Sequence, residues 1–446
     1  MSAPNTLSSA EQFLDLARKA GADAADVLAV DGIAVQVRVR NGATDKVERS
    51  EATDFGLRVF VDGASAVVSG TARSAQDFQT LAERAVAMAK TAPPDASLHL
   101  QDTSGTADPP DRLELADDAR PGTDTLTDLA LTAEAACREV EGVTKTDGSA
   151  ASSGHREIAL VTSNGFCGTY RRTGYSISAS AIAGEGTSME RDYDYSSKVH
   201  FADLDDAHGI GRRAGERAVR ALNPRKMASR KCPVIFEARL ASSFASLLAQ
   251  AANGSGVVRG TSFLKDMMDK QVFARGVSII DDPLLTRGLS SKPFDAEGLL
   301  CEPLNLVEDG VLSNWLLDGR TAAKLDLTSN ARAARSTGGQ PTPSSTNLWL
   351  ANGTVSAQDL IGSVKDGIVI TSMFSSGVNM VTGDYSRGAA GLRIENGEIT
   401  HPVSEITIAG NLKDMFIKLT PANDLEMKSS TNAPTCMVEG MTVAGA

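Results

Sequence analysis

The sequence predicts an α+β fold, with two helix–antiparallel-strand–helix units followed by a large, mostly antiparallel β domain containing one prominent helix. Three observations lead to this prediction. Apolar residues at helical spacing open and close each of the first two units. Between these helices, apolar residues alternate and are separated by Asn-Gly and Asp-Gly pairs, which are typical of hairpin turns. The last part of the chain carries many such pairs. We therefore expect domains over residues 1–115, 116–228 and 229–446.

The first unit begins with a predicted helix in which Phe13, Leu14 and Ala17 recur at helical spacing. Ser8 and Glu11 match a capping box at its start. Two hairpins and a second helix are predicted next, over residues 33–42, 55–68 and 74–90. The following stretch is rich in Pro, Asp, Gly and Ser, so we place a domain boundary within it.

The second unit repeats the order of helix, strands and helix. Its helices are predicted over residues 124–139 and 203–222, and a Ser-Asn-Gly turn at 163–165 separates two strands. A further turn is expected at Asp147-Gly148. The resemblance between the units is one of element order, because no residue-level repeat is visible.

The last domain has one clear predicted helix, Leu240–Ala252. Beyond it, turn pairs separate many short segments of strand-like sequence. These pairs are Asp309-Gly310, Gly338-Gly339, Asn352-Gly353, Asp366-Gly367 and Asn396-Gly397. Such regular turns favour a large antiparallel β domain.

The charge balance argues against a nucleic-acid-binding protein. The formal net charge is −12 and the pI is near 5.0, so a polyanion would be repelled over most of the surface. The local basic cluster at residues 225–230 is better interpreted as a solvated face than as a nucleic-acid patch.

Cysteine usage and hydropathy indicate a cytoplasmic protein. The five cysteines are odd in number, widely spaced and without a C-x-x-C pair, which fits reduced thiols. The first residues lack the basic and apolar regions of a signal peptide. No apolar run approaches the ~20 residues that span a bilayer, so no membrane association is expected.

Metal-binding spacing is missing from the sequence. No two of the five histidines are four or five residues apart, and no cysteine lies near a histidine at zinc-site spacing. His200 and His208, eight residues apart, could share a metal, but ordinary surface histidines are the better interpretation. We therefore expect this chain to hold no metal and no other cofactor.

A serine nucleophile has one weak candidate. Ser262-Phe-Leu-Lys265 matches S-x-x-K, in which an amine could activate the hydroxyl. The G-x-S-x-G elbow and the S-D-N and K-T-G companions are missing, so a loop after the helix is the better interpretation. We expect no catalytic residue in this chain.

The densest polar cluster lies between two glycines near the C-terminal end. A turn that carries backbone N–H groups and an arginine could hold a carboxylate, a peptide or a partner protein. An Asp–Arg pair that stabilises a hairpin is an equally good interpretation. The candidate residues are Thr382, Gly383, Asp384, Ser386 and Arg387.

The most specific segments of the chain carry a family resemblance. They span residues 379–391, 402–416 and 438–443, with a secondary match over 281–314. Through them the chain resembles the TldD/TldE (PmbA) metalloprotease family, and in particular its TldE half, from about residue 10 to its end. The resemblance implies two α+β units followed by a β-rich domain.

In the TldD half of this family, the first helix of the third domain carries H-E-x-x-x-H, which holds zinc and supplies a glutamate base. In this chain the motif would fall near Ala245, Ser246 and Gln250, none of which can play its part. A further TldD ligand is a cysteine in a Gly-Met-Cys-Gly-like segment. Cys436 has a different context, so we do not equate the two.

The resemblance thus implies a non-catalytic, metal-free subunit of a heteromeric zinc-dependent peptidase that acts on small unfolded peptides. A TldD-like paralogue would be its partner and would supply the zinc. Two alternatives remain. The chain could be a homo-oligomeric peptide-binding or scaffolding protein without a peptidase partner, or a metal-independent hydrolase that uses Ser262 and Lys265.

Overall fold

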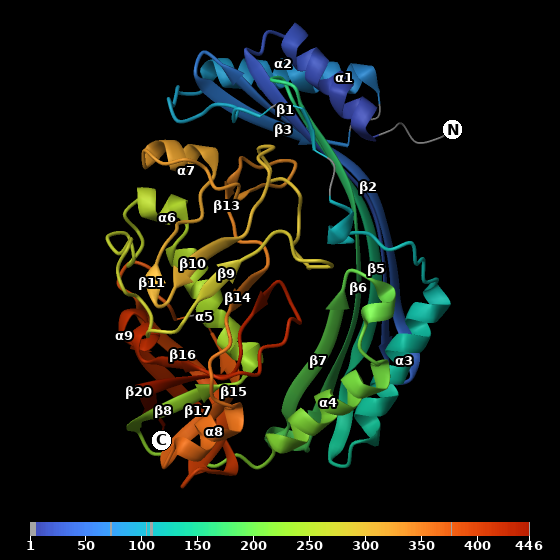
Figure 1. The fold of residues 1–446 in the computed structure, drawn as a ribbon. Helices are drawn as coiled ribbons and strands as arrows, with labels where there is room; N and C mark the ends of the chain where they lie inside the picture. The colour runs from blue at the N-terminus through green and yellow to red at the C-terminus, as the bar shows by residue number, and fades with distance from the viewer. Residues whose placement is uncertain (1–5, 72–73, 104, 108–109, 376, 446) are drawn as a thin grey trace.

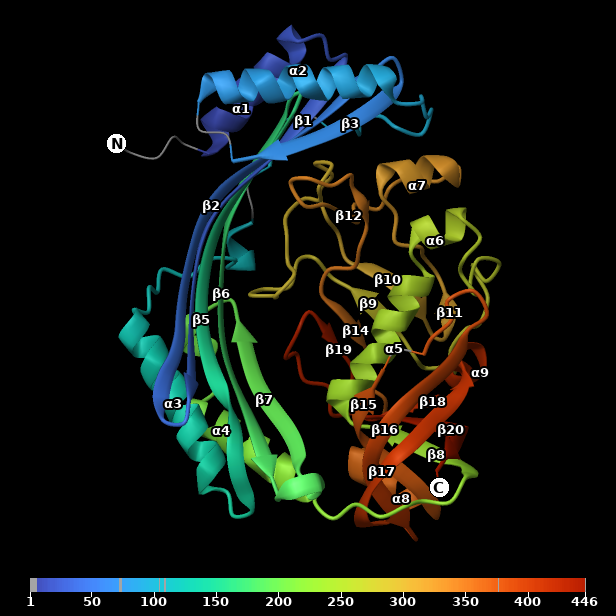
Figure 2. The same ribbon diagram turned by 180° about the vertical axis from the view of Figure 1, so that it is seen from behind.

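The computed structural model describes residues 6–71, 74–103, 105–107, 110–375 and 377–445. A long curved sheet arches along one side of the molecule, and the C-terminal domain lies on its concave side (Figures 1 and 2). Helices α1 (Thr6–Lys19) and α2 (Ala75–Thr91) cover one end of the arch, and α3 (Thr123–Glu139) and α4 (Ala207–Arg220) cover the other. Within the described residues, no helix is long and apolar enough to cross a membrane.

The arched sheet contains strands from both predicted α+β units. Its strand order is β3-β2-β1-β5-β6-β4, and β7 pairs with β6. The strands are β1 (Ala24–Arg40), β2 (Ala43–Val61), β3 (Ala64–Gly70), β4 (Gly105–Ala107), β5 (Val143–Thr162), β6 (Phe166–Ala183) and β7 (Glu190–Lys198). The two units join because β1 and β5 pair antiparallel, from Asp26↔Thr162 to Val39↔Ser149.

Each pair of helices buries its apolar face against one part of the sheet. Phe13 of α1 and Phe78 of α2 pack against each other, with ring centroids 4.8 Å apart, over Leu57 and Val59 of β2. At the other end, alanines of α3 and α4 pack on the alternating buried residues of β6. Small side chains at this second contact let the helices lie close to the sheet.

The C-terminal domain is built on two larger sheets. A six-stranded sheet has the order β17-β16-β15-β8-β20-β18, and a five-stranded sheet has the order β11-β10-β9-β14-β19. Most pairings are antiparallel, as predicted; β8–β15 and β14–β19 are parallel. The strands of the first sheet are β8 (Arg230–Phe236), β15 (Asp366–Phe374), β16 (Asp384–Glu395), β17 (Glu398–Asn411), β18 (Leu419–Pro421) and β20 (Cys436–Ala444).

The second sheet and the helices complete this domain. The strands are β9 (Ile279–Asp281), β10 (Leu304–Glu308), β11 (Val311–Leu312), β14 (Leu348–Leu350) and β19 (Thr431–Asn432), with β12 (Ala333–Ala334) and β13 (Thr342–Pro343) as a separate pair. The helices are α5 (Ala238–Ala251), α6 (Gly254–Val258), α7 (Gly319–Lys324), α8 (Ala357–Ser363) and α9 (Leu412–Ile417). Helix α5 is the predicted prominent helix, and it is packed in the centre of the domain core.

Four local predictions are wrong. One is the turn at Asn352-Gly353, where the structure has no turn and the Gly353 N–H donates to the Ala422 carbonyl oxygen. Helix α1 already includes Thr6, whose buried side chain extends the apolar face upstream, so Ser8 lies inside the helix and does not cap it. Gly148 sits at an irregularity within the continuous strand β5, not at a turn, and a Cβ there would lie 2.5 Å from the Val39 carbonyl oxygen. Gly367 lies within β15, where a Cβ would come 2.8 Å from the Pro233 carbonyl oxygen. Gly148 and Gly367 both lie where another segment of backbone comes too close for a side chain.

A buried cluster of acidic and basic side chains joins the arched sheet to the C-terminal domain. Asp26 of β1 accepts hydrogen bonds from Arg58 of β2, at 2.7 Å from Nε, and from Arg335. Arg58 also lies 3.4 Å from Glu297, measured between Nη1 and Oε1. These four side chains are at most 3% exposed. Because Arg335 and Glu297 belong to the C-terminal domain, the cluster fastens that domain to the arch.

Candidate functional site

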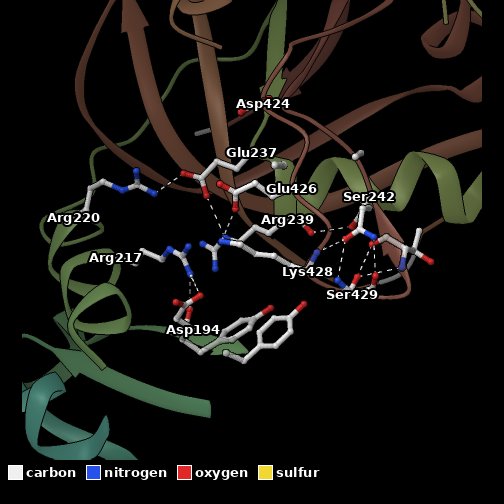
Figure 3. Close-up of a pocket in the computed structure, with 16 residues that line it drawn as sticks. Asp194, Arg217, Arg220, Glu237, Arg239, Ser242, Asp424, Glu426, Lys428 and Ser429 are labelled. Atoms are coloured by element: carbon white, nitrogen blue, oxygen red, sulfur yellow. Dashed lines mark hydrogen bonds and ion pairs between the residues drawn. The ribbon is translucent and has the colours of Figure 1, made fainter. Parts of the chain in front are cut away.

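A pocket of about 350 Å³ lies between the arched sheet and the C-terminal domain (Figure 3). Its walls come from β7, α4, the start of α5 and the segment before and within β19. The lining residues are Tyr193, Asp194, Tyr195, Arg217, Arg220, Glu237, Ala238, Arg239, Ser242, Asp424, Glu426, Lys428, Ser429, Thr431, Asn432 and Ala433. Charged and aromatic side chains that are far apart in the sequence therefore meet here.

Arg239 of α5 is the best-anchored cation of the pocket. Its two Nη atoms bind the carboxylate of Asp192 at 2.6 and 2.7 Å, and its Nε lies 3.2 Å from Glu237. The guanidinium also lies 5.7 Å from the Tyr193 ring centroid, within cation–π range. Burial alone would lower the pKa of Arg239, but the hydrogen bonds and charge of Asp192 raise it above its ordinary value. This arginine is held rigidly and stays charged.

The other arginines of the pocket are also paired with carboxylates. Arg217 of α4 binds Asp194 at 2.9 Å, and Arg220 binds Glu237 at 2.5 Å. Figure 3 shows Arg220 and Arg239 reaching the same Glu237 carboxylate. Because these charges are neutralised within the protein, the pocket favours an uncharged polar ligand, such as a peptide main chain, over a free anion.

A second groove continues from this pocket along α5, because Ser242 lines both cavities. The groove has a volume of about 530 Å³ and lies between α5 and the segment that leads into β16. Its lining residues are Ser242, Ser243, Ser246, Leu247, Gln250, Val378, Met380 and Arg387. Those from α5 recur at intervals of three and four residues, so they share one face of the helix.

The three positions matched to the lost zinc motif do not share one environment. Ser246 and Gln250 line the groove, whereas Ala245 is fully buried in the domain core. The motif H-E-x-x-x-H places its three functional residues at positions n, n+1 and n+5. Among the described residues of α5, the one set with this spacing in which all three members line the groove is Ser242, Ser243 and Leu247. Two hydroxyls and an aliphatic side chain cannot replace two imidazoles and a carboxylate.

The side chains along this groove do not fit a zinc ion. Zinc in proteins is bound by thiolate, imidazole or carboxylate groups, and the described lining offers hydroxyls, one amide, one guanidinium and apolar groups. Elsewhere in the described chain, no group of three or more His, Cys, Asp or Glu is arranged to hold a metal ion. His200 and His208 bond separately, to the Glu114 carbonyl and the Glu139 carboxylate.

Three of the five polar candidates near the C-terminus, Thr382, Gly383 and Asp384, belong to a turn that their hydrogen bonds and backbone conformation stabilise. The Thr382 hydroxyl donates to the Asp384 carboxylate at 2.6 Å, and Asn411 donates to the other oxygen of that carboxylate at 3.1 Å. These hydrogen bonds lower the pKa of Asp384. Gly383 has φ +85°, which glycine adopts readily, and Ser386 is exposed on β16.

Arg387 is the candidate that lines the groove. Its Nε donates to the Ser375 carbonyl oxygen at 2.9 Å. It forms no ion pair with Asp384 or with any other residue that the structure describes. The predicted Asp–Arg pair is therefore wrong, and Arg387 is one of the residues that line the groove.

The Ser262–Lys265 pair is not assembled for catalysis. Ser262 is 3% exposed, and its hydroxyl donates to the Ala251 carbonyl at 2.6 Å while accepting from the Leu264 N–H. Lys265 is exposed on the surface. The serine hydroxyl thus holds the end of α5 and is not available to a substrate.

We expect Ser262→Ala to lower the free energy of unfolding by about 1–2 kcal/mol, because it leaves a buried carbonyl without its hydrogen bond. Lys265→Ala should leave stability unchanged within about 0.5 kcal/mol. Urea unfolding measures both. A hydrolase that used this pair would in addition lose peptide cleavage in both variants.

Four of the five cysteines, Cys137, Cys232, Cys301 and Cys436, are poor nucleophiles. Burial raises the pKa of the Cys232 thiol to about 11 and that of Cys301 to about 12. Burial, with the nearby charge of Glu134, raises the pKa of Cys137 to about 12. Cys436 is fully buried, and burial raises its pKa also. These thiols stay protonated near neutral pH, and the thiolate is the reactive form.

Family models match this chain over all three of its domains. Models of the PmbA/TldA metallopeptidase domains match this chain in order: domain 1 at residues 25–89, the central domain at 116–222 and the C-terminal domain at 229–445. The chain belongs to the PmbA/TldD metallopeptidase family. The predicted family is thus confirmed, and helix α5 lies in the part matched by the C-terminal metallopeptidase domain.

Relatives in this family match over nearly the whole chain. The chain is 34% identical to metalloprotease PmbA of Escherichia coli O157:H7, over 95% of this chain and 92% of that protein. It is also 34% identical to a PmbA homologue of Haemophilus influenzae, over 97% and 94% of the two chains.

Solved structures share the fold. A Bacteroides thetaiotaomicron protein described as a candidate modulator of DNA gyrase superposes with a TM-score of 0.88 at 27% identity, over 98% of both chains. TldE of Thermococcus kodakarensis has a TM-score of 0.84 at 18% identity, over 98% of this chain and 99% of that one. The second likeness concerns the fold alone.

Sequence reasoning missed the pocket of Figure 3. Tyr193, Arg217 and Arg239 come from β7, α4 and α5, and their carboxylate partners give no local pattern. A weak signal is the run of alternating acidic and aromatic residues in β7, Glu190–Lys198, which places Tyr193 and Tyr195 on one face.

Proposed function

We propose that this chain is the metal-free, TldE/PmbA-like subunit of a heteromeric peptidase whose TldD-like partner supplies zinc and the catalytic base. The observation that carries the proposal is the groove face of α5. In a chain of a metallopeptidase family, this face presents Ser242, Ser243 and Leu247 where the H-E-x-x-x-H spacing would fit. The chain therefore contributes binding surface, while the partner performs bond cleavage.

The proposed role of this chain is to hold an extended peptide next to the partner's zinc. The neutralised pocket of Figure 3 and the groove along α5 form one polar channel through their shared Ser242. An unfolded peptide exposes main-chain donors and acceptors that the hydroxyls and amides of such a channel can bind. A folded protein would not enter it, so small unfolded peptides are the proposed substrates, in the cytoplasm.

Co-purification with the TldD-like paralogue of the same organism tests this proposal. We expect a stable complex that cleaves an unfolded peptide in a chelator-sensitive way, and no cleavage by this chain alone. Robust chelator-sensitive cleavage by this chain alone would contradict the proposal. If no complex forms and the chain associates with itself while binding peptide, the scaffolding alternative replaces it.

A further inference from the structure

The groove along α5 carries one unneutralised charge. Among the described residues that line it, Arg387 is the one charged side chain. The pocket of Figure 3 differs, because its arginines are paired with Asp192, Asp194 or Glu237. A lone cation in a groove, with no carboxylate of its own, is suited to a carboxylate from a ligand.

The Arg387 guanidinium is oriented before any ligand binds. Its Nε donates to the Ser375 carbonyl oxygen at 2.9 Å, which fixes the plane of the group. Tyr385, two residues before it on the same face of β16, is 1% exposed; its hydroxyl lies within hydrogen-bonding reach of Arg387 and also donates to the sulfur of Met373 at 3.4 Å. A guanidinium held on one edge can present its Nη atoms as a pair, and this geometry matches the two oxygens of a carboxylate.

Further hydrogen-bonding groups face Arg387 from α5. Ser246 and Gln250 lie one helical turn apart, and within the described part of the chain neither side chain has a hydrogen-bond partner. The hydroxyls of Ser242 and Ser243 donate to carbonyl oxygens of their own helix, so their oxygens remain available as acceptors. These groups can bind the last amide of a peptide beside its carboxylate.

The remaining wall of the groove is apolar. Leu247, Val378 and Met380 line it. Phe374, which pairs with Gly388 next to Arg387, is 55% exposed, and Val381 is also 55% exposed. Exposed large apolar groups beside a binding groove commonly contact a ligand. The groove thus joins an arginine, hydroxyl and amide groups, and an apolar surface.

We propose that this groove binds the free C-terminal carboxylate of a peptide that ends in an apolar residue, with Arg387 as the carboxylate-binding residue. The inference rests on the proposed function, because it specifies which end of the peptide this subunit holds. The volume of about 530 Å³ accommodates several atoms beyond a carboxylate, and the apolar wall disfavours a small inorganic anion. An acidic side chain within a peptide is a competing source of the same carboxylate.

Fluorescence anisotropy with the full chain tests the inference. The probes are N-terminally labelled hexapeptides of Ser, Gly and Ala that end in Leu, one as the free acid and one as the C-terminal amide. A third probe is an amidated peptide with an internal Glu. A charge-assisted hydrogen bond to a partly exposed arginine corresponds to a roughly tenfold tighter dissociation constant for the free acid.

Arg387→Gln should abolish the preference for the free acid, and Arg387→Lys should retain part of it because the charge remains without the planar fork. Arg275→Gln is the matched control, since Arg275 is an exposed arginine of the same domain outside the groove. This control should bind as the unmodified chain does. Circular dichroism of each variant confirms that the fold is retained.

Equal affinity for acid and amide, or no saturable binding of either, overturns the inference. Tighter binding of the internal-Glu peptide than of the free acid also overturns it, because the groove would then select a side chain. The inference and the proposed function can fail separately. If a complex with the TldD-like chain cleaves peptides without any preference for a free C-terminus, the proposed function stands and the inference fails. A free-acid preference without complex formation leaves this inference intact and removes the peptidase role.

Discussion

Asp26→Asn is expected to lower the free energy of unfolding by about 3–5 kcal/mol, as is typical when one member of a buried ionic cluster is removed. The variant keeps the size of the side chain but removes its charge. Arg58 and Arg335 would then be buried without the carboxylate charge that compensates their own positive charges. The cluster joins the arch to the C-terminal domain, so we expect the loss to appear as earlier separation of these two parts.

Urea unfolding monitored by tryptophan fluorescence and by circular dichroism measures the effect. Asp45→Asn on the exposed part of β2 is the matched control and should change stability by no more than about 0.5 kcal/mol. A similar small change for Asp26→Asn would show that the cluster contributes little to holding the domains together.

Glu297→Gln is expected to remove a pH dependence of stability. Burial raises the pKa of Glu297 from 4.5 to about 7, and the charge of Asp295 adds to this, although the charge of Arg58 opposes it. The folded state therefore holds a proton that the unfolded state releases between these values. The contribution of Glu297 to stability is fully present below pH 4.5 and is lost as the pH rises through about 7.

The expected loss is about 3 kcal/mol between pH 4.5 and pH 8, at about 1.4 kcal/mol for each unit of pKa. Other carboxylates, such as Asp366, have lowered pKa values and give the opposite slope, so the wild-type curve alone is not diagnostic. The difference between wild type and Glu297→Gln isolates this residue. We expect Glu297→Gln to gain stability relative to wild type as the pH rises, and Glu308→Gln, at an exposed position, to show no such trend. A pH-independent difference for Glu297→Gln would contradict the assignment.

Local structure followed from the sequence where the signal is local. The turn at Asn41-Gly42 has φ values of +56° and +75°, as a tight hairpin requires, and the helix predicted over residues 74–90 is α2, Ala75–Thr91. The Gly148 and Gly367 turns were wrong because a glycine is also needed where another backbone comes close. A glycine at a turn and a glycine at a close backbone approach look the same in the sequence.

The pairing of segments that are distant in the chain could not be predicted from the sequence. The pairing of β1 with β5 joins segments that are more than 100 residues apart, and both strands show the same alternation that any half-buried strand shows. The candidate site has the same limit. Arg387 was among the predicted residues, but its position opposite Ser246 and Gln250 depends on how β16 packs on α5. Ala245 was grouped with those two residues because an uncertain register does not reveal which face of a helix is buried.

Reconstitution with an inactivated partner tests the central claim most directly. The TldD-like chain would carry Gln in place of the glutamate of its H-E-x-x-x-H motif and would be purified in complex with this chain. We predict a complex that still forms and binds peptide, contains no zinc in this subunit after the two chains are separated, and cleaves nothing. Cleavage that persists in this complex, or stoichiometric zinc in the separated subunit, would show that this chain performs chemistry of its own.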